Sequence, residues 1–306
     1  MKSTDILLAI LVAIIWGVAF VATEFALQSF TPAQLTSFRF VLAALPVFFF
    51  RKPNISWLLL ITLGLFLFTG QFMFLFFAYK AGMPPGLASV ATHTQALFTI
   101  IIAAVVLREV PLPRQISAVA IAFIGLGFVF ASVDGSLTYL GLCLTLAGAV
   151  SWSIGNTILK RLGNVDMLAL MIWLSLVPPL PAMVFSYAIG DDFDLMHRFH
   201  EASVISLLSL GYLGIISTTV AYAIWGRLLN TYPAVMVTPF ALFAPCAGVL
   251  MSYIVFGEDF GTLRGAGMIL IMVGVAGTIL LGPRKPEIKG TVANTPENPG
   301  TFGKLN

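Results

Sequence analysis

Long apolar stretches dominate the chain and alternate with short segments that carry charged or turn-forming residues. Each stretch holds about 17–25 residues, enough for a helix to cross the hydrocarbon core of a bilayer, which is about 30 Å thick. The pattern predicts an all-α integral membrane protein with ten transmembrane helices, at residues 5–23, 33–50, 56–79, 84–107, 113–133, 138–160, 167–189, 203–227, 233–256 and 262–282. Residues 284–306 lack a hydrophobic period, so we expect a disordered cytoplasmic tail there.

The composition supports this class of protein. Hydrophobic residues make up 59% of the 306 residues and charged residues 9%, and the mean hydropathy is +0.99, which excludes a soluble globular domain. The first apolar run is too long for a secretion signal and is expected to remain as a span. Cys143 and Cys246 lie in apolar runs, so we expect neither a disulfide nor a metal site. The expected partners are the lipid bilayer and a small-molecule substrate, with no nucleic acid, and the oligomeric state is left open.

The basic residues predict the orientation of the chain. If both termini are cytoplasmic, the inner segments hold twelve lysines and arginines, and the outer segments hold only Lys80, Arg198 and Arg264. An excess of lysine and arginine marks the cytoplasmic side. We therefore expect cytoplasmic termini and an outer loop around Asp191.

Weak internal similarity points to two copies of a five-helix unit. A shift of 149 residues places Pro84 on Pro233 and Glu109 on Glu258, and a shift of 136 residues places Trp16 on Trp152. Because each unit has an odd number of spans, the two copies must cross the membrane in opposite senses. We expect inverted repeats at residues 1–135 and 136–283, with a substrate site near the midplane where they meet.

The predicted fourth span holds a concentration of polar side chains. Pro84 and Pro85 favour a helix start there. At about 100° per residue, one face of roughly 160° then collects Ser89, Thr92, His93, Gln95 and Thr99, while Thr94 points away. Such a helix can turn its polar face to a solvated cavity and its apolar face to lipid or to other helices.

Three ionisable residues in or near the spans are candidates for transport chemistry. His93 lies near the midplane, where an imidazole can carry a proton or bind substrate, or can simply join two helices. Arg39 lies about 9 Å deep and could clamp a carboxylate, pair with Glu24 or extend toward the interface. Glu24, at the outer end of the first span, could accept a proton or attract an ammonium group, or could simply be solvated.

Several aromatic and amide residues are candidates for lining the pathway. Trp16 and Trp152 lie away from the interfacial belts, so their indoles could wall a cavity and stack on an ammonium group. Packing at helix crossings is the alternative. Weaker candidates are Gln71, Tyr79, Asn156, Tyr222 and Trp225. Five prolines, Pro178, Pro179, Pro181, Pro239 and Pro245, predict kinks in the seventh and ninth spans.

Four segments resemble the EamA family of the drug/metabolite transporter superfamily. They are Ile15-Trp16-Gly17-Val18-Ala19-Phe20, Gly82-Met83-Pro84-Pro85-Gly86-Leu87-Ala88-Ser89, Val150-Ser151-Trp152-Ser153-Ile154-Gly155-Asn156 and Tyr222-Ala223-Ile224-Trp225-Gly226. The resemblance covers nearly the whole chain except the tail. It implies ten helices in two inverted five-helix repeats, cytoplasmic termini in a bacterial inner membrane, and efflux of small metabolites.

Three positions depart from the family pattern. Ala19 and His93 stand where exporters of O-acetylserine and cysteine have asparagine and glutamine, and Glu24 stands where many relatives have lysine. Each position falls near the expected pathway, so these residues bear on the identity of the cargo.

An alternating-access exporter of small amino acids such as cysteine or O-acetylserine fits these observations best. Other amino acids or drug-like cations are the alternative cargo, although a bulky cation would require a buried acid. A membrane-embedded enzyme would need paired acids, a nucleophile with a base, or metal-ligand spacing, and a scaffold would not explain the polar face. The chain has no Walker motif, so ATP is not the expected energy source, and no cofactor is expected.

The orientation can be tested by labelling single cysteines in a variant without Cys143 and Cys246. Asp191→Cys should react with a membrane-impermeant maleimide in intact cells, whereas a cysteine placed after Arg284 should react only in broken cells. Labelling of Asp191→Cys only after cell breakage would contradict both the orientation and the inverted repeat.

Overall fold

The structure is a computed structural model, and it describes all residues except 109, 135, 163–164, 192–194 and 282–306. The expected tail and Glu109 therefore lie outside the described residues. Within the described residues the chain forms helices and no β-strand, which confirms the all-α class.

The elements run as follows. The first half contains α1 (Ser3–Ala26), α2 (Pro32–Ala44), α3 (Trp57–Gly64), α4 (Gln71–Lys80), α5 (Pro85–Thr92), α6 (Gln95–Val106) and α7 (Pro113–Ala131). The second half contains α8 (Tyr139–Leu159), α9 (Met167–Leu174), α10 (Pro179–Ala188), α11 (Leu195–Glu201), α12 (Val204–Gly211), α13 (Ala221–Thr231), α14 (Ala234–Val237), α15 (Phe243–Phe256) and α16 (Gly261–Leu280). Two 3₁₀ segments, η1 (Leu45–Phe49) and η4 (Thr238–Leu242), and two π-helical segments, η2 (Leu65–Gly70) and η3 (Tyr212–Val220), complete them.

These elements combine into ten rods that are long and apolar enough to cross a membrane, so the prediction of ten spans is confirmed. The first, fifth, sixth and tenth rods are the continuous helices α1, α7, α8 and α16. The third and eighth rods each pass through a π-helical segment, η2 and η3. The seventh is interrupted before Pro179, where the prolines predict a kink.

The fourth rod differs from the sequence-based expectation of one helix over 84–107. It is broken at His93 and Thr94, between α5 and α6. At the break, the backbone N–H groups of His93 and Thr94 bond to carbonyls three residues back, and the Thr94 hydroxyl bonds to the Ala91 carbonyl. This side-chain bond offers the backbone an alternative to the helical ladder, which accounts for a break without a proline.

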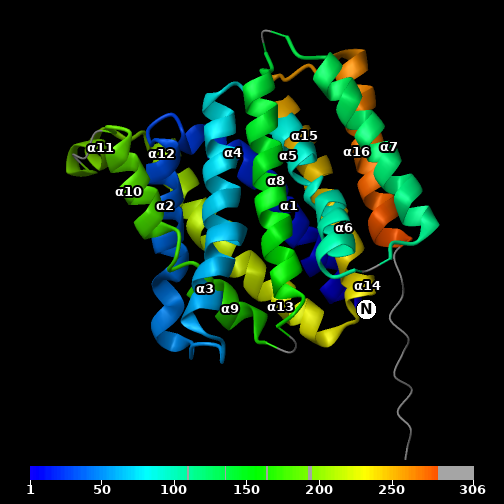
Figure 1. Cartoon of the computed structure of the whole chain (residues 1–306). Helices are drawn as coiled ribbons and strands as arrows, with labels where there is room; N and C mark the ends of the chain where they lie inside the picture. Colours follow the sequence, from blue (N-terminus) through cyan, green and yellow to red (C-terminus); the bar gives the residue numbers. More distant parts are fainter. Residues whose placement is uncertain (109, 135, 163–164, 192–194, 282–306) are drawn as a thin grey trace, which may run out of the picture.

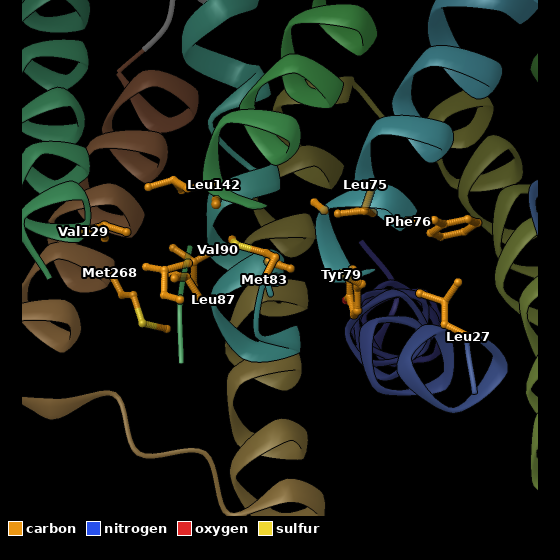
Figure 2. Packing of buried hydrophobic residues seen from close by; sticks show 14 of the residues in the cluster. Leu27, Leu75, Phe76, Tyr79, Met83, Leu87, Val90, Val129, Leu142 and Met268 are labelled. Carbon is orange, nitrogen blue, oxygen red and sulfur yellow. The ribbon is translucent and has the colours of Figure 1, made fainter. Parts of the chain in front are cut away.

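The rods form a bundle around α1, which contacts α5, α12, α13 and α15. Helices α7 and α16 run side by side along one edge, and α10 and α11 lie at the other (Figure 1). We call the end of the bundle that holds the N-terminus the near end and the opposite end the far end. Figure 2 shows part of the apolar core, in which Leu87 and Val90 of α5 lie near Met268 of α16 and Val129 of α7, while Tyr79 of α4 lies near Leu27.

Small residues bring α7 and α16 into close contact. A Cβ at Gly274 would lie 2.5 Å from Ala122 Cβ and 2.6 Å from the Ala118 carbonyl oxygen. Glycine at this position therefore lets the two backbones approach closely, as is typical of helix pairs in membranes.

Polar contacts tie the helices together at both ends of the bundle. At the near end, the buried Asp5 carboxylate accepts hydrogen bonds from the Tyr232 hydroxyl at 2.7 Å and from Arg227 at 3.2 Å. At the far end, Arg264 lies in the first turn of α16 rather than in a loop, and it bonds Ser132 and Asp134. Hydrogen bonds from Ser136, and to a smaller extent the one from Arg264, hold the pKa of Asp134 below its usual range.

The glycine contact between α7 and α16 predicts a difference between two substitutions on one helix. Gly274→Ala should lower the free energy of unfolding by about 1–3 kcal/mol, because the methyl group overpacks the contact. Gly265→Ala is the matched control, since a Cβ there meets no atom within 4 Å. Thermal unfolding of both purified variants in detergent measures the difference, and equal melting temperatures would contradict the close approach.

Candidate functional site

Arg39 is a buried cation without an acidic partner in the part of the chain that the structure describes. Its side chain lies in α2 with 5% of its surface exposed. The Nε group donates to Thr218 Oγ1 at 3.2 Å, and Cζ lies 4.1 Å from the centre of the Phe72 ring. Within the described residues it forms no ion pair, and its two Nη groups have no hydrogen-bond partner. The guanidinium therefore neither pairs with Glu24 nor extends to the interface, and its free N–H groups can donate hydrogen bonds to an anion.

Aromatic rings of α1 and α13 gather next to Arg39. The ring of Trp16 lies 5.5 Å from that of Tyr222 and 5.1 Å from that of Trp225. Tyr222 also lies within electrostatic reach of the guanidinium of Arg39. These contacts bring together four of the sequence-predicted residues, Trp16, Arg39, Tyr222 and Trp225.

Trp152 lies on the other side of this group. Its ring and that of Tyr222 lie 6.2 Å and 6.3 Å from the ring of Phe68, which stands between them. The two tryptophans related by the predicted repeat thus do not contact each other. Asn156, one turn further along α8, is half-buried, and its amide has no hydrogen-bond partner in the described part of the chain.

Buried oxygen atoms without hydrogen-bond partners lie on the surrounding helices. The segment η3 supplies Ser217, whose hydroxyl is orphaned although its carbonyl accepts the Trp16 indole N–H at 3.1 Å. Gln71 of α4 and Gln95 of α6 each have an orphaned amide oxygen, and the hydroxyl of Thr92 is orphaned as well. Leaving a buried polar atom unbonded costs free energy, so such atoms mark positions where a polar ligand or water is favoured.

We call the group formed by Arg39, Trp16, Phe72, Ser217, Thr218 and Tyr222 the Arg39 cluster. Sequence analysis missed Phe72, Ser217 and Thr218. Thr218 lies 179 residues from Arg39, and no local pattern links two positions that far apart. The π-helical turn that carries Ser217 and Thr218 would have been the useful signal, since such turns occur often at functional sites.

His93 occupies the break between α5 and α6. Its Nδ1 donates to the Ser89 carbonyl at 2.7 Å, and Nε2 has no hydrogen-bond partner among the described residues. Nδ1 must be the donor because a carbonyl only accepts, so the Nε2 lone pair of the neutral ring is available. The half-buried imidazole can therefore bind a proton or a ligand at Nε2.

The expected polar face of the fourth span does not form one cavity wall. Ser89 is fully buried, and its hydroxyl bonds to the carbonyls of Gly86 and Pro245. Thr94, which was expected to point away from this face, is fully buried too, and Thr99 bonds to the Gln95 carbonyl of its own helix. Most of these hydroxyls thus bond to backbone carbonyls. His93 and the orphaned oxygens of Thr92 and Gln95 remain available to a ligand.

Tyr79 and Glu24 lie apart from the Arg39 cluster, at the far end. The Tyr79 hydroxyl donates to the Phe20 carbonyl at 3.1 Å. Lys80 and Glu258 interact electrostatically with Glu24 there. Glu258 was not among the sequence-based candidates, although the predicted repeat placed it opposite Glu109.

Comparison with known proteins agrees with this architecture. A family model described as "EamA-like transporter family" matches residues 3–131 and 139–280. The chain is 36% identical over 282 residues to a "Probable amino-acid metabolite efflux pump" of Salmonella typhimurium, covering 90% of this chain and 94% of that protein. It is 35% identical, with the same coverage, to the protein of that name in Escherichia coli.

Two further likenesses are more distant. An "Uncharacterized inner membrane transporter" of Escherichia coli is 24% identical over 295 residues, covering 90% of this chain and 91% of the relative. One crystal structure superposes with a TM-score of 0.63 at 17% identity, covering 92% of this chain and 98% of the other. This second likeness concerns the fold alone.

Proposed function

Because the chain belongs to the EamA-like transporter family and is a transporter rather than an enzyme, we propose that it exports small amino-acid metabolites across the bacterial inner membrane. Cysteine and O-acetylserine are the proposed cargo, moved by alternating access with both chain termini in the cytoplasm. The names of the two relatives that are 35–36% identical, and the inner-membrane location in the name of a third, support this assignment.

The observation that carries the cargo assignment is the Arg39 cluster. A guanidinium buried in the membrane without an acid is costly, and a cargo carboxylate would supply the missing charge through two parallel hydrogen bonds. The neighbouring rings of Trp16 and Tyr222 offer π faces to an ammonium group, and the orphaned Ser217 hydroxyl offers an acceptor. A compact zwitterion matches this set of groups.

Drug-like cations are the alternative cargo, and the charges argue against them. A cation needs a carboxylate in its site, and no aspartate or glutamate contacts the Arg39 cluster among the described residues. The partly buried acids Glu24 and Glu258 lie at the far end instead.

The paired irregularities of the helices support the proposed inverted repeat. The first and sixth spans, and the fifth and tenth, are continuous helices, whereas the third and eighth both pass through a π-helical segment. The fourth span breaks between α5 and α6, and the ninth changes type between η4 and α15. Each pair consists of spans five apart, as two five-helix units require.

We assign proton coupling to His93, with Glu24 as a second proton-accepting group near the far end. His93 is the titratable side chain closest to the middle of its span, and its free Nε2 atom can take up a proton. Gln71, Gln95, Trp152, Asn156 and Trp225 are proposed to line the pathway, with Tyr79 beside it at the far end.

The cargo assignment predicts how two substitutions at Arg39 change export. In proteoliposomes loaded with cysteine or O-acetylserine, Arg39→Met should reduce transport more than about tenfold, because it removes charge-assisted bonds to the carboxylate. Arg39→Lys should retain part of the activity, since it keeps the charge but loses the planar fork. Arg161→Met, at an exposed site after α8, is the control. Transport of lipophilic cations alone, by the unsubstituted protein, would replace this cargo with the alternative.

The coupling assignment predicts that His93→Gln keeps part of the cargo flux but loses its dependence on an imposed pH gradient. Glutamine retains hydrogen bonding but cannot change charge near neutral pH. Flux measured with and without the gradient gives the ratio directly. An unchanged ratio in His93→Gln would remove the imidazole from coupling and leave Glu24 as the group to examine.

A further inference from the structure

The loop between α15 and α16 folds back over the first turn of α5 at the far end. Glu258 Oε2 accepts a hydrogen bond from the backbone N–H of Gly86 at 3.1 Å, and the same N–H bonds Ser252 Oγ at 3.0 Å. Backbone donors in the first turn of a helix lack helical partners, and a carboxylate there is favoured by the positive end of the helix.

Glycine at position 86 lets the loop side chains approach the backbone of α5 closely. A Cβ there would lie 2.8 Å from Glu258 Oε2 and 2.6 Å from Cζ of Phe260. The loop that carries the acid is short and begins at Gly257, whose φ of 65° ends α15 in the left-handed conformation. The acid is thus brought to the start of α5 by a tight turn and a residue without a side chain.

A chain of hydrogen bonds continues from this contact to His93. The Gly86 carbonyl accepts from Ser89 Oγ at 2.6 Å, and the Ser89 carbonyl accepts from His93 Nδ1 at 2.7 Å. The helix between them has only eight residues, and His93 follows its last residue. The position of the imidazole therefore depends on where this short helix is held.

We propose that Glu258 is a positioning residue for His93, because its carboxylate fixes the first turn of α5 and the helix in turn fixes the imidazole. The inference rests on the proposed coupling role of His93. It assigns a role to an acid that lies at the opposite end of α5 from His93 and belongs to the other half of the chain.

Charged groups from several elements face this contact. Glu24 of α1 and Arg264 of α16 interact electrostatically with Glu258. Lys80 at the end of α4, and Asp259, which follows Glu258 in the chain, lie at the same end of the bundle. Burial raises the pKa of Glu258, while hydrogen bonds from Ser252 and Gly86 and the charge of Arg264 oppose the rise. Because its carboxylate loses charge at a higher pH than an exposed glutamate does, the tests below belong at mildly alkaline pH.

The test compares two substitutions at Glu258 in proteoliposomes. Glu258→Ala removes the charged one of the two acceptors of the Gly86 N–H, so the ratio of cargo flux with and without a pH gradient should fall to that of His93→Gln. Glu258→Gln keeps an oxygen at the same place and should restore most of the ratio. Asp259→Asn removes the neighbouring exposed charge and should leave the ratio unchanged.

A double variant distinguishes positioning from an independent effect. If Glu258 acts through His93, Glu258→Ala should change the flux ratio no further in the His93→Gln background. An additional loss in the double variant would overturn the proposal. So would a Glu258→Ala protein whose ratio equals that of the unsubstituted chain.

Hydrogen–deuterium exchange tests the contact without reference to transport. Exchange at the amides of residues 86–92 should rise about tenfold in Glu258→Ala and stay near the original rate in Glu258→Gln, because the side-chain oxygen that accepts from the Gly86 N–H is lost only in the first. Equal exchange in both variants would contradict the proposal. Cargo flux that persists in these variants while the prediction fails would leave the proposed export function intact, whereas absence of flux in the unsubstituted protein would refute that function itself.

Discussion

Hydrocarbon offers no partner to a backbone N–H or C=O group, and this constraint decides where the helices of the bundle can be irregular. The helices α7 and α16, paired along one edge, are continuous, and so is the central α1. Polar residues of the irregular turns are covered by protein: in η3, Ser217 and Thr218 are at most 3% exposed, and at the break of the fourth span Thr94 is fully buried. The π-helical segment η3 carries Thr218, whose hydroxyl accepts the hydrogen bond from Arg39. The break of the fourth span carries His93, whose Nε2 has no hydrogen-bond partner among the described residues.

Among the described residues the buried charged side chains are those of Asp5, Arg39 and Arg264, and they differ in their partners. Asp5 and Arg227 pair at the near end, and Arg264 and Asp134 pair at the far end, so both partners are present in each case. Arg39 lies between these ends and has no such partner in the described residues. A membrane protein retains an intramembrane charge of this kind at a considerable cost in free energy, which makes a functional anion the simplest explanation.

The ten spans could be predicted from the sequence because hydrophobic length is a local property. The prolines likewise predicted the kink before Pro179. The position of Arg39 within a span could be read from its place in an apolar run. Its partners could not be predicted, since Thr218 is fixed by packing across 179 residues. The break at His93 carries no glycine or proline signal and arises from a threonine bond to the backbone. The contact of Glu258 with Gly86 was missed because it joins a loop of one half to the first turn of a helix in the other.

The central claim is that the cargo carboxylate completes the coordination of Arg39, and an experimental structure of the protein with bound cysteine or O-acetylserine tests it most directly. The account predicts ligand density within hydrogen-bond distance of both Nη groups of Arg39, with the ammonium group toward Trp16, Tyr222 and Ser217. Density at the far end beside Glu24, with the Nη groups of Arg39 still without a partner, would contradict it.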